Sequence, residues 1–87
     1  MAESDNFRLV FTARAAEDVK QLDGLTAKRI GKKIMELEID PVGKSKKLVS
    51  PKLGTYRFRI GDYRVIFDIH GRNIVVLRIG HRREIYR

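Results

Sequence analysis

The segment YRFRIGDYRVIFDI, residues 56–69, restricts the fold of this chain more than any other part. Large apolar side chains alternate with charged ones on both sides of Gly61-Asp62, and such alternation predicts strands with one buried face. A Gly-Asp pair between two strands is typical of a two-residue type II′ turn. We therefore predict a β-hairpin with strands at residues 54–60 and 63–69.

A two-residue turn also fixes which side chains face each other across the hairpin. The expected pairs are Ile60–Tyr63, Arg59–Arg64, Phe58–Val65, Arg57–Ile66 and Tyr56–Phe67. Because side chains alternate between the faces of a strand, one face is apolar and suited to a core. The other face gathers Arg57, Arg59 and Arg64 beside Asp68.

This arginine face needs an explanation, because like charges directly opposite each other destabilise a sheet by up to about 1 kcal/mol per pair. Asp68 is expected to neutralise part of the cluster, but one carboxylate does not balance three guanidiniums. Two explanations remain open. The face is either a solvated, solubilising surface or a site for an anion, since guanidinium binds phosphate in bidentate fashion.

The N-terminal half predicts one strand and two helices. The apolar run FRLVF, residues 7–11, indicates the strand. Thr12 and Thr26 are the expected N-caps of the two helices, which end at Asp23-Gly24 and at Asp40-Pro41.

Residues 41–52, with Pro, Gly, Ser and four lysines, predict a basic loop with little regular structure. Residues 73–79 are apolar on both sides and indicate a central strand covered on both faces. The order is β-α-α-β-β-β, an α+β fold in which two N-terminal helices pack on one face of a small, mostly antiparallel sheet. A chain of 87 residues is too short for two cores, so residues 1–87 form one domain.

The composition excludes several classes of protein. The absence of cysteine excludes disulfides and thiolate chemistry, and the two histidines, His70 and His81, are far apart, so no metal or other cofactor is expected. The N-terminus has no signal-peptide pattern, and the longest apolar run, Ile74–Leu77, is too short to cross a bilayer. We expect a soluble cytoplasmic protein with no membrane contact.

Positive charge is concentrated in the second half of the chain. Residues 41–87 contain 12 Lys and Arg against 3 Asp and Glu, whereas residues 1–40 contain 7 against 8. Such segregation indicates a polyanionic partner, most simply nucleic acid, although a soluble basic surface without a partner is the alternative. The expected RNA- or ribosome-binding residues are Lys44, Lys46, Lys47, Lys52, Arg83 and Arg87. The cations of the second helix, residues 28–33, are interpreted as a solvated face.

The C-terminal segment LRIGHRREIYR, residues 77–87, adds an aromatic ring to the arginines. It leaves the central strand at Gly80 and brings His81, Arg82 and Tyr86 beside the hairpin. Single-stranded RNA is recognised by aromatic rings that stack on bases and guanidiniums that hold phosphates. The tail therefore favours RNA as the anion.

YRFRIGDYRVIFDI followed by IVVLRIGHRREIY resembles the RelE/ParE superfamily, and within it the RelE-type toxins of prokaryotic toxin–antitoxin modules. The resemblance implies a metal-independent, ribosome-dependent endoribonuclease that cleaves mRNA in the A site. It also implies contact with ribosomal RNA and neutralisation by an acidic, RelB-like antitoxin that covers the tail.

Carried over residue by residue, the resemblance implies catalytic roles for Arg57, Arg59, Arg64, Arg82 and Tyr86. Arg64 and Arg82 would clamp the scissile phosphate while the RNA 2′-hydroxyl attacks it. The best-known RelE differs: it has lysines at the positions of Arg57 and Arg59, two more residues before the tyrosine, and a C-terminal helix.

Proton transfer is open at this point, because arginine, with a pKa above about 12, is a poor general base. His81 is either an acid–base group or a cap on the strand end. Tyr86 either stacks on a base or loses its proton and takes part in the chemistry. Groups of the ribosome are a third possible source of proton transfer.

Three alternatives remain. A ParE-like toxin would share the fold but inhibit DNA gyrase. A non-catalytic module would only bind nucleic acid. A degenerate toxin would still bind its antitoxin but would have lost its activity.

Overall fold

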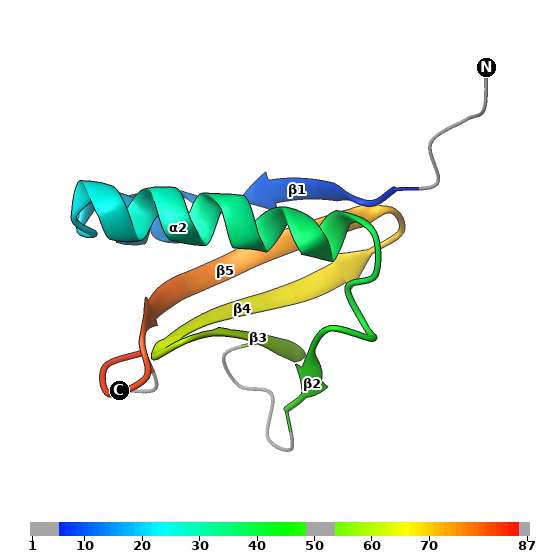
Figure 1. The fold of residues 1–87 in the computed structure, drawn as a ribbon. Helices are drawn as coiled ribbons and strands as arrows, with labels where there is room; N and C mark the ends of the chain where they lie inside the picture. The colour runs from blue at the N-terminus through cyan, green and yellow to red at the C-terminus, as the bar shows by residue number, and fades with distance from the viewer. Residues whose placement is uncertain (1–5, 49–53, 86–87) are drawn as a thin grey trace.

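The structure, a computed structural model, describes residues 6–48 and 54–85. The elements in chain order are β1 (Arg8–Phe11), α1 (Ala13–Lys20), α2 (Gly24–Ile34), the 3-10 helix η1 (Met35–Glu38), β2 (Lys46–Lys47), β3 (Tyr56–Ile60), β4 (Tyr63–His70) and β5 (Asn73–His81). The strands form a sheet in the order β1-β5-β4-β3-β2, in which β1 is parallel to β5 and the other pairs are antiparallel. The predicted α+β class is confirmed (Figure 1).

The predicted hairpin is confirmed pair by pair. Ile60 pairs with Tyr63, Arg59 with Arg64, and the remaining expected pairs follow in the same register. Gly61 has a φ of 59°, the left-handed conformation that the first position of a type II′ turn requires and that glycine adopts without strain.

The segment at residues 41–52 departs from the predicted loop. Lys46 and Lys47 form the short strand β2, which pairs with Arg57 and Tyr56 of β3. The sheet therefore has five described strands and not four. The outer edge of β3 has backbone N–H and C=O groups that need partners, and a neighbouring extended segment supplies them whatever its side chains are.

The helix ends also differ in detail from the predictions. Thr12 caps α1 as expected, its hydroxyl accepting a hydrogen bond from Ala15 N at 3.1 Å. Asp23, and not Thr26, caps α2, because its carboxylate accepts from both the backbone N–H and the hydroxyl of Thr26, at 2.8 and 2.9 Å. These bonds lower the pKa of Asp23 below 3.8. The α-helix ends at Ile34 and tightens into η1 before Asp40-Pro41 is reached.

The two helices cover one face of the sheet and build the core there (Figure 1). Buried side chains of this core come from both α-helices, from η1 and from β3, β4 and β5: Ala15, Ile30, Ile34, Leu37, Phe58, Ile60, Val65, Phe67, Ile74, Val76 and Ile79. Asp18 attaches α1 to the edge of β5, accepting from Arg78 Nε at 2.8 Å and from Ile79 N at 2.9 Å. Within residues 6–48 and 54–85, no helix has the length and apolar character needed to traverse a membrane.

The cap of α2 predicts a pH dependence. Because folding lowers the pKa of Asp23, its carboxylate stabilises the fold above the unfolded pKa, and this contribution is lost as the pH falls through the folded value. We expect Asp23→Asn to lower the free energy of unfolding at pH 7 and to approach the wild-type value below about pH 4. Urea unfolding at several pH values measures the difference; a gap that stays constant down to acid pH contradicts this role of the carboxylate.

Candidate functional site

The arginines of the hairpin share one face but differ in exposure. Arg59 lies directly opposite Arg64 and is exposed, whereas Arg64 is only 7% exposed. Arg57, opposite the buried Ile66, is half-buried. The predicted cluster is therefore formed by the hairpin, but only Arg57 and Arg59 present much of their side chains to solvent.

Arg64 is held by the turn that it follows. Its Nη1 donates to the carbonyl oxygens of Gly61 and Tyr63, each at 3.1 Å. A guanidinium fixed in this way satisfies backbone groups of the turn and keeps its own charge within the arginine cluster. Arg64 is therefore much less exposed than Arg59 across the hairpin, and the residue supports the turn as well as the charge.

The sheet face opposite the helices is partly covered. Ile66 and Ile85 are 0% and 1% exposed, although neither belongs to the main core. A Cβ on Gly54 would lie 2.7 Å from Ile66 Cγ2 and 2.8 Å from Leu77 Cδ1, so the backbone of Gly54 packs against this face. The face that alternation alone predicts to be wet is therefore buried at Ile66, where Gly54 packs against it.

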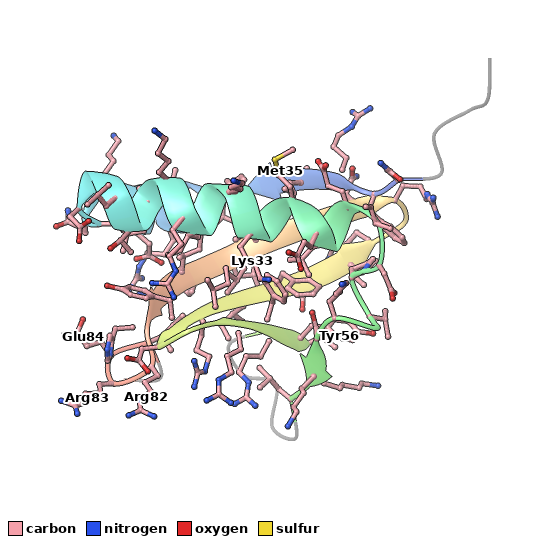
Figure 2. All side chains as sticks on the ribbon, viewed as in Figure 1. Lys33, Met35, Tyr56, Arg82, Arg83 and Glu84 are labelled. Atoms are coloured by element: carbon pink, nitrogen blue, oxygen red, sulfur yellow. The ribbon has the colours of Figure 1, made fainter. Side chains whose placement is uncertain are left out.

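Arg82 contacts the hairpin turn with its backbone N–H. Its N–H donates to Asp62 O at 2.8 Å, and its Nε lies 3.8 Å from Asp62 Oδ1. The side chain remains 49% exposed, and Figure 2 shows Arg82 and Arg83 projecting from the turn that follows β5. The predicted approach of the tail to the hairpin is confirmed for Arg82, and Asp62, treated in the sequence only as a turn residue, positions it.

His81 connects the end of β5 to the following turn. Its Nδ1 accepts a hydrogen bond from Arg83 N at 3.2 Å, and its ring contacts Tyr63 edge-to-face with centroids 5.5 Å apart. The strand-capping role is therefore present. Since Nδ1 is an acceptor, Nε2 is the nitrogen that carries the proton of the neutral ring.

Asp68 does not neutralise the arginines. Its Oδ1 accepts from Thr55 N at 2.6 Å, and none of the ion pairs within residues 6–48 and 54–85 includes it. The expectation is wrong because the carboxylate lies beside the start of β3 and is used there to satisfy a backbone donor.

The lysines of the predicted binding segment divide into two groups. Lys46 and Lys47 are exposed on β2, and Lys46, paired with Arg57, extends the positive face of the hairpin, whereas Lys47, paired with Tyr56, lies on the other face. Lys44 lies apart, with its Nζ 3.9 Å from Glu36 Oε1. Three further predicted residues lie outside the described part of the chain: Lys52, Tyr86 and Arg87.

The sequence is similar to toxins of type II toxin–antitoxin systems. The family described as "ParE toxin of type II toxin-antitoxin system, parDE" matches residues 9–86. Toxin RelE3 of Methanocaldococcus jannaschii is 30% identical over 83 residues, which cover 91% of this chain and 94% of that toxin.

Solved structures of toxin–antitoxin complexes contain chains with the same fold. The toxin–antitoxin complex RelBE2 of Mycobacterium tuberculosis contains a chain that superposes with a TM-score of 0.80 at 25% identity, covering 87% of this chain and 98% of that one. The RelB–RelE antitoxin–toxin complex of Methanococcus jannaschii gives 0.69 at 30% identity, with 88% and 94% covered.

The different burial of Arg59 and Arg64 predicts different effects on stability. Arg64→Ala removes the donor of two carbonyl groups and should lower the free energy of unfolding by about 1–3 kcal/mol. Arg59→Ala removes an exposed like charge and should change it by less than about 0.5 kcal/mol. Denaturant titration of both variants measures this; a loss of less than about 0.5 kcal/mol for Arg64→Ala would contradict a stabilising role of its contacts.

Proposed function

Because the chain belongs to the RelE/ParE superfamily of toxins from type II toxin–antitoxin systems, we propose that it is a RelE-type endoribonuclease. In this proposal it enters the ribosome, cleaves mRNA in the A site and thereby inhibits translation. The observation that supports it best is the attachment of Arg82 to Asp62, which brings a half-exposed arginine side chain to the arginine hairpin.

The arrangement suits phosphoryl transfer without a covalent intermediate. The RNA 2′-oxygen attacks the adjacent phosphate, the bond to the 5′-oxygen breaks, and the products are a 2′,3′-cyclic phosphate and a 5′-hydroxyl. Negative charge grows on the phosphate oxygens in the transition state, and preorganised cations stabilise it. Arg57, Arg59 and Arg82 supply these cations, while Arg64 holds the turn between them.

Two protons must move in this reaction, one from the 2′-hydroxyl and one to the leaving 5′-oxygen. Within the described tail, the His81 imidazole is a group that can both give and take a proton. For His81 to act as the acid, the ring must be an imidazolium with a proton on each nitrogen, so the hydrogen bond from Arg83 N to Nδ1 would break. Nε2 would then give its proton to the leaving 5′-oxygen, and the proton of the 2′-hydroxyl would pass to a separate base. The alternatives are the hydroxyl of Tyr86 and groups of the ribosome.

A small basic face does not align an in-line attack by itself. The reacting atoms must be held about 3–3.5 Å apart in the correct orientation. In this proposal the two accessible hairpin arginines, Arg57 and Arg59, contact only the sugar–phosphate backbone of the RNA. We propose that the ribosome supplies the alignment, so that free RNA is cleaved poorly.

We propose an acidic, RelB-like antitoxin as the neutralising partner. The chain has a formal net charge of +8, and toxins of this fold are found with RelB in the complexes of M. tuberculosis and M. jannaschii. We propose that the protein acts in the cytoplasm, where mRNA is translated and where it would meet both the ribosome and the antitoxin.

One observation favours a second candidate, because the matching family is described by its ParE toxin. A ParE-like protein would act on DNA gyrase and would not require arginines around a scissile phosphate. The density of guanidiniums at the hairpin and tail favours the ribonuclease.

Removal of one transition-state cation should abolish most of the cleavage. We expect Arg82→Ala to slow mRNA cleavage on programmed ribosomes by about 100-fold or more, the effect typical of losing one such donor. Arg14→Ala, an exposed position on α1, is the matched control and should cleave normally. Uncut mRNA with the wild-type chain, together with inhibited gyrase, would favour the ParE-like alternative.

The role of the terminal tyrosine is tested separately with Tyr86→Phe, which retains the ring and removes the hydroxyl. If the hydroxyl transfers a proton, single-turnover cleavage on the ribosome should fall by about 100-fold or more. Near-normal cleavage would contradict proton transfer by Tyr86 and assign its ring to stacking.

A further inference from the structure

The sheet ends on one side at β1, and part of the backbone of this edge strand has no partner among the described residues. In a parallel pair, alternate residues of a strand bond to its neighbour. Arg8 N and Thr12 N donate to carbonyl groups of β5 and of the turn before it, at 2.8 and 3.1 Å. Leu9 and Phe11 therefore point their N–H and C=O groups away from β5, and no described residue bonds to them.

Apolar side chains beside this edge are exposed. Val10 and Phe11 of β1 are 40% and 42% exposed, and Met35, the first residue of η1, is 56% exposed. η1 packs against β1, where Glu38 O accepts a hydrogen bond from Phe7 N at 2.7 Å. Figure 2 shows Met35 on the side of the molecule where β1 lies. Outward backbone groups and exposed apolar side chains thus share one edge.

The β1 edge has little protection against pairing with another strand. Exposed edges usually carry lysine, proline or a bulge, or are covered by a helix or a loop. The sequence of β1 is RLVF, in which only Arg8, at the first position, is charged. The other edge of the sheet differs, because β2 consists of Lys46 and Lys47. The β1 edge is therefore the one suited to accept a further strand.

The charge distribution favours a second copy of the chain over an acidic partner at this edge. Residues 1–40 contain 7 Lys and Arg against 8 Asp and Glu, whereas residues 41–87 contain 12 against 3. An acidic segment is attracted to the second half of the chain, and so toward the lysines of the opposite edge. Two copies that meet at β1 bring together nearly neutral segments and keep their basic hairpins apart.

The sequence of β1 is compatible with antiparallel pairing to itself. A two-fold axis at Val10 places Val10 opposite its own copy, Leu9 opposite Phe11, and Arg8 opposite Thr12. The outward groups of Leu9 and Phe11 then bond to each other across the axis, as in a hydrogen-bonded antiparallel pair. No like charges lie opposite each other in this register, and the exposed apolar side chains pack on those of the partner.

We propose that the chain forms a symmetric dimer in which the two β1 strands pair antiparallel about Val10. The two sheets join into one, with the β1 strands at its centre and the arginine hairpins toward its two ends. Both copies contribute the same patch, so the contact closes without leaving a free edge at β1. Because η1 contacts β1, the exposed Met35 of each copy lies beside the join.

A single substituted cysteine reports the register, because the chain has no cysteine of its own. Residues of a non-hydrogen-bonded antiparallel pair have Cα atoms about 4.5 Å apart, a separation at which disulfides form. We expect Val10→Cys to form an intermolecular disulfide under mild oxidation about 10-fold faster than Leu25→Cys or more, since pairing holds the two thiols together. Leu25, on α2 and 83% exposed, is the matched control, and non-reducing electrophoresis measures both rates.

A charged residue at the same position tests the dimer without oxidation. Val10→Lys places two like charges opposite each other at the axis and adds a lysine to the edge. At about 0.1 mM protein, above the micromolar dissociation constants of modest interfaces, sedimentation equilibrium should give twice the chain mass for the wild type. Val10→Lys should give the mass of one chain, and Leu25→Lys should remain a dimer.

Three results would overturn the proposal: a wild type that sediments as one chain at this concentration, a Val10→Lys variant that remains a dimer, or equal disulfide rates for Val10→Cys and Leu25→Cys. A single-chain wild type would leave the β1 edge to a strand of another protein. Neither readout involves RNA, so a dimer that leaves mRNA intact overturns the ribonuclease and retains this inference. A single chain that cleaves mRNA does the reverse.

Discussion

The two-residue turn at Gly61-Asp62 is the constraint on which the rest of the structure depends. The positive φ of Gly61 permits the turn, and the turn places Arg59 opposite Arg64 and the apolar residues of both strands toward the helices. The Asp62 carbonyl then receives the N–H of Arg82. One local backbone conformation thus determines the core, the arginine cluster and the position of the tail, three features that are distant in sequence.

The hairpin was predictable because its determinants are local: a turn dipeptide, alternation, and a register that follows from both. What the sequence did not predict depends on neighbours distant along the chain. Lys46 and Lys47 form β2 because the edge of β3 needs partners, and Asp68 serves Thr55 instead of the arginines. Arg64 is buried although Arg59, directly opposite it, is exposed, a difference that alternation does not predict.

The electrostatics connect the fold to the proposed activity. A sheet selected only for stability would not pair Arg59 with Arg64, nor place Arg29 and Lys32 near the same turn. Repulsion of this kind is retained where an anion offsets it. The sheet face that carries the arginines is also partly apolar, because Ile66, opposite Arg57, is 0% exposed.

The central claim is that these guanidiniums act on a phosphodiester of mRNA held by the ribosome. The most direct measurement is the chemistry and position of the RNA ends produced when the wild-type chain meets a programmed ribosome. The account predicts a single break in the A-site codon, with a 2′,3′-cyclic phosphate on one fragment and a 5′-hydroxyl on the other. Intact mRNA, or breaks with a 5′-phosphate, would contradict it.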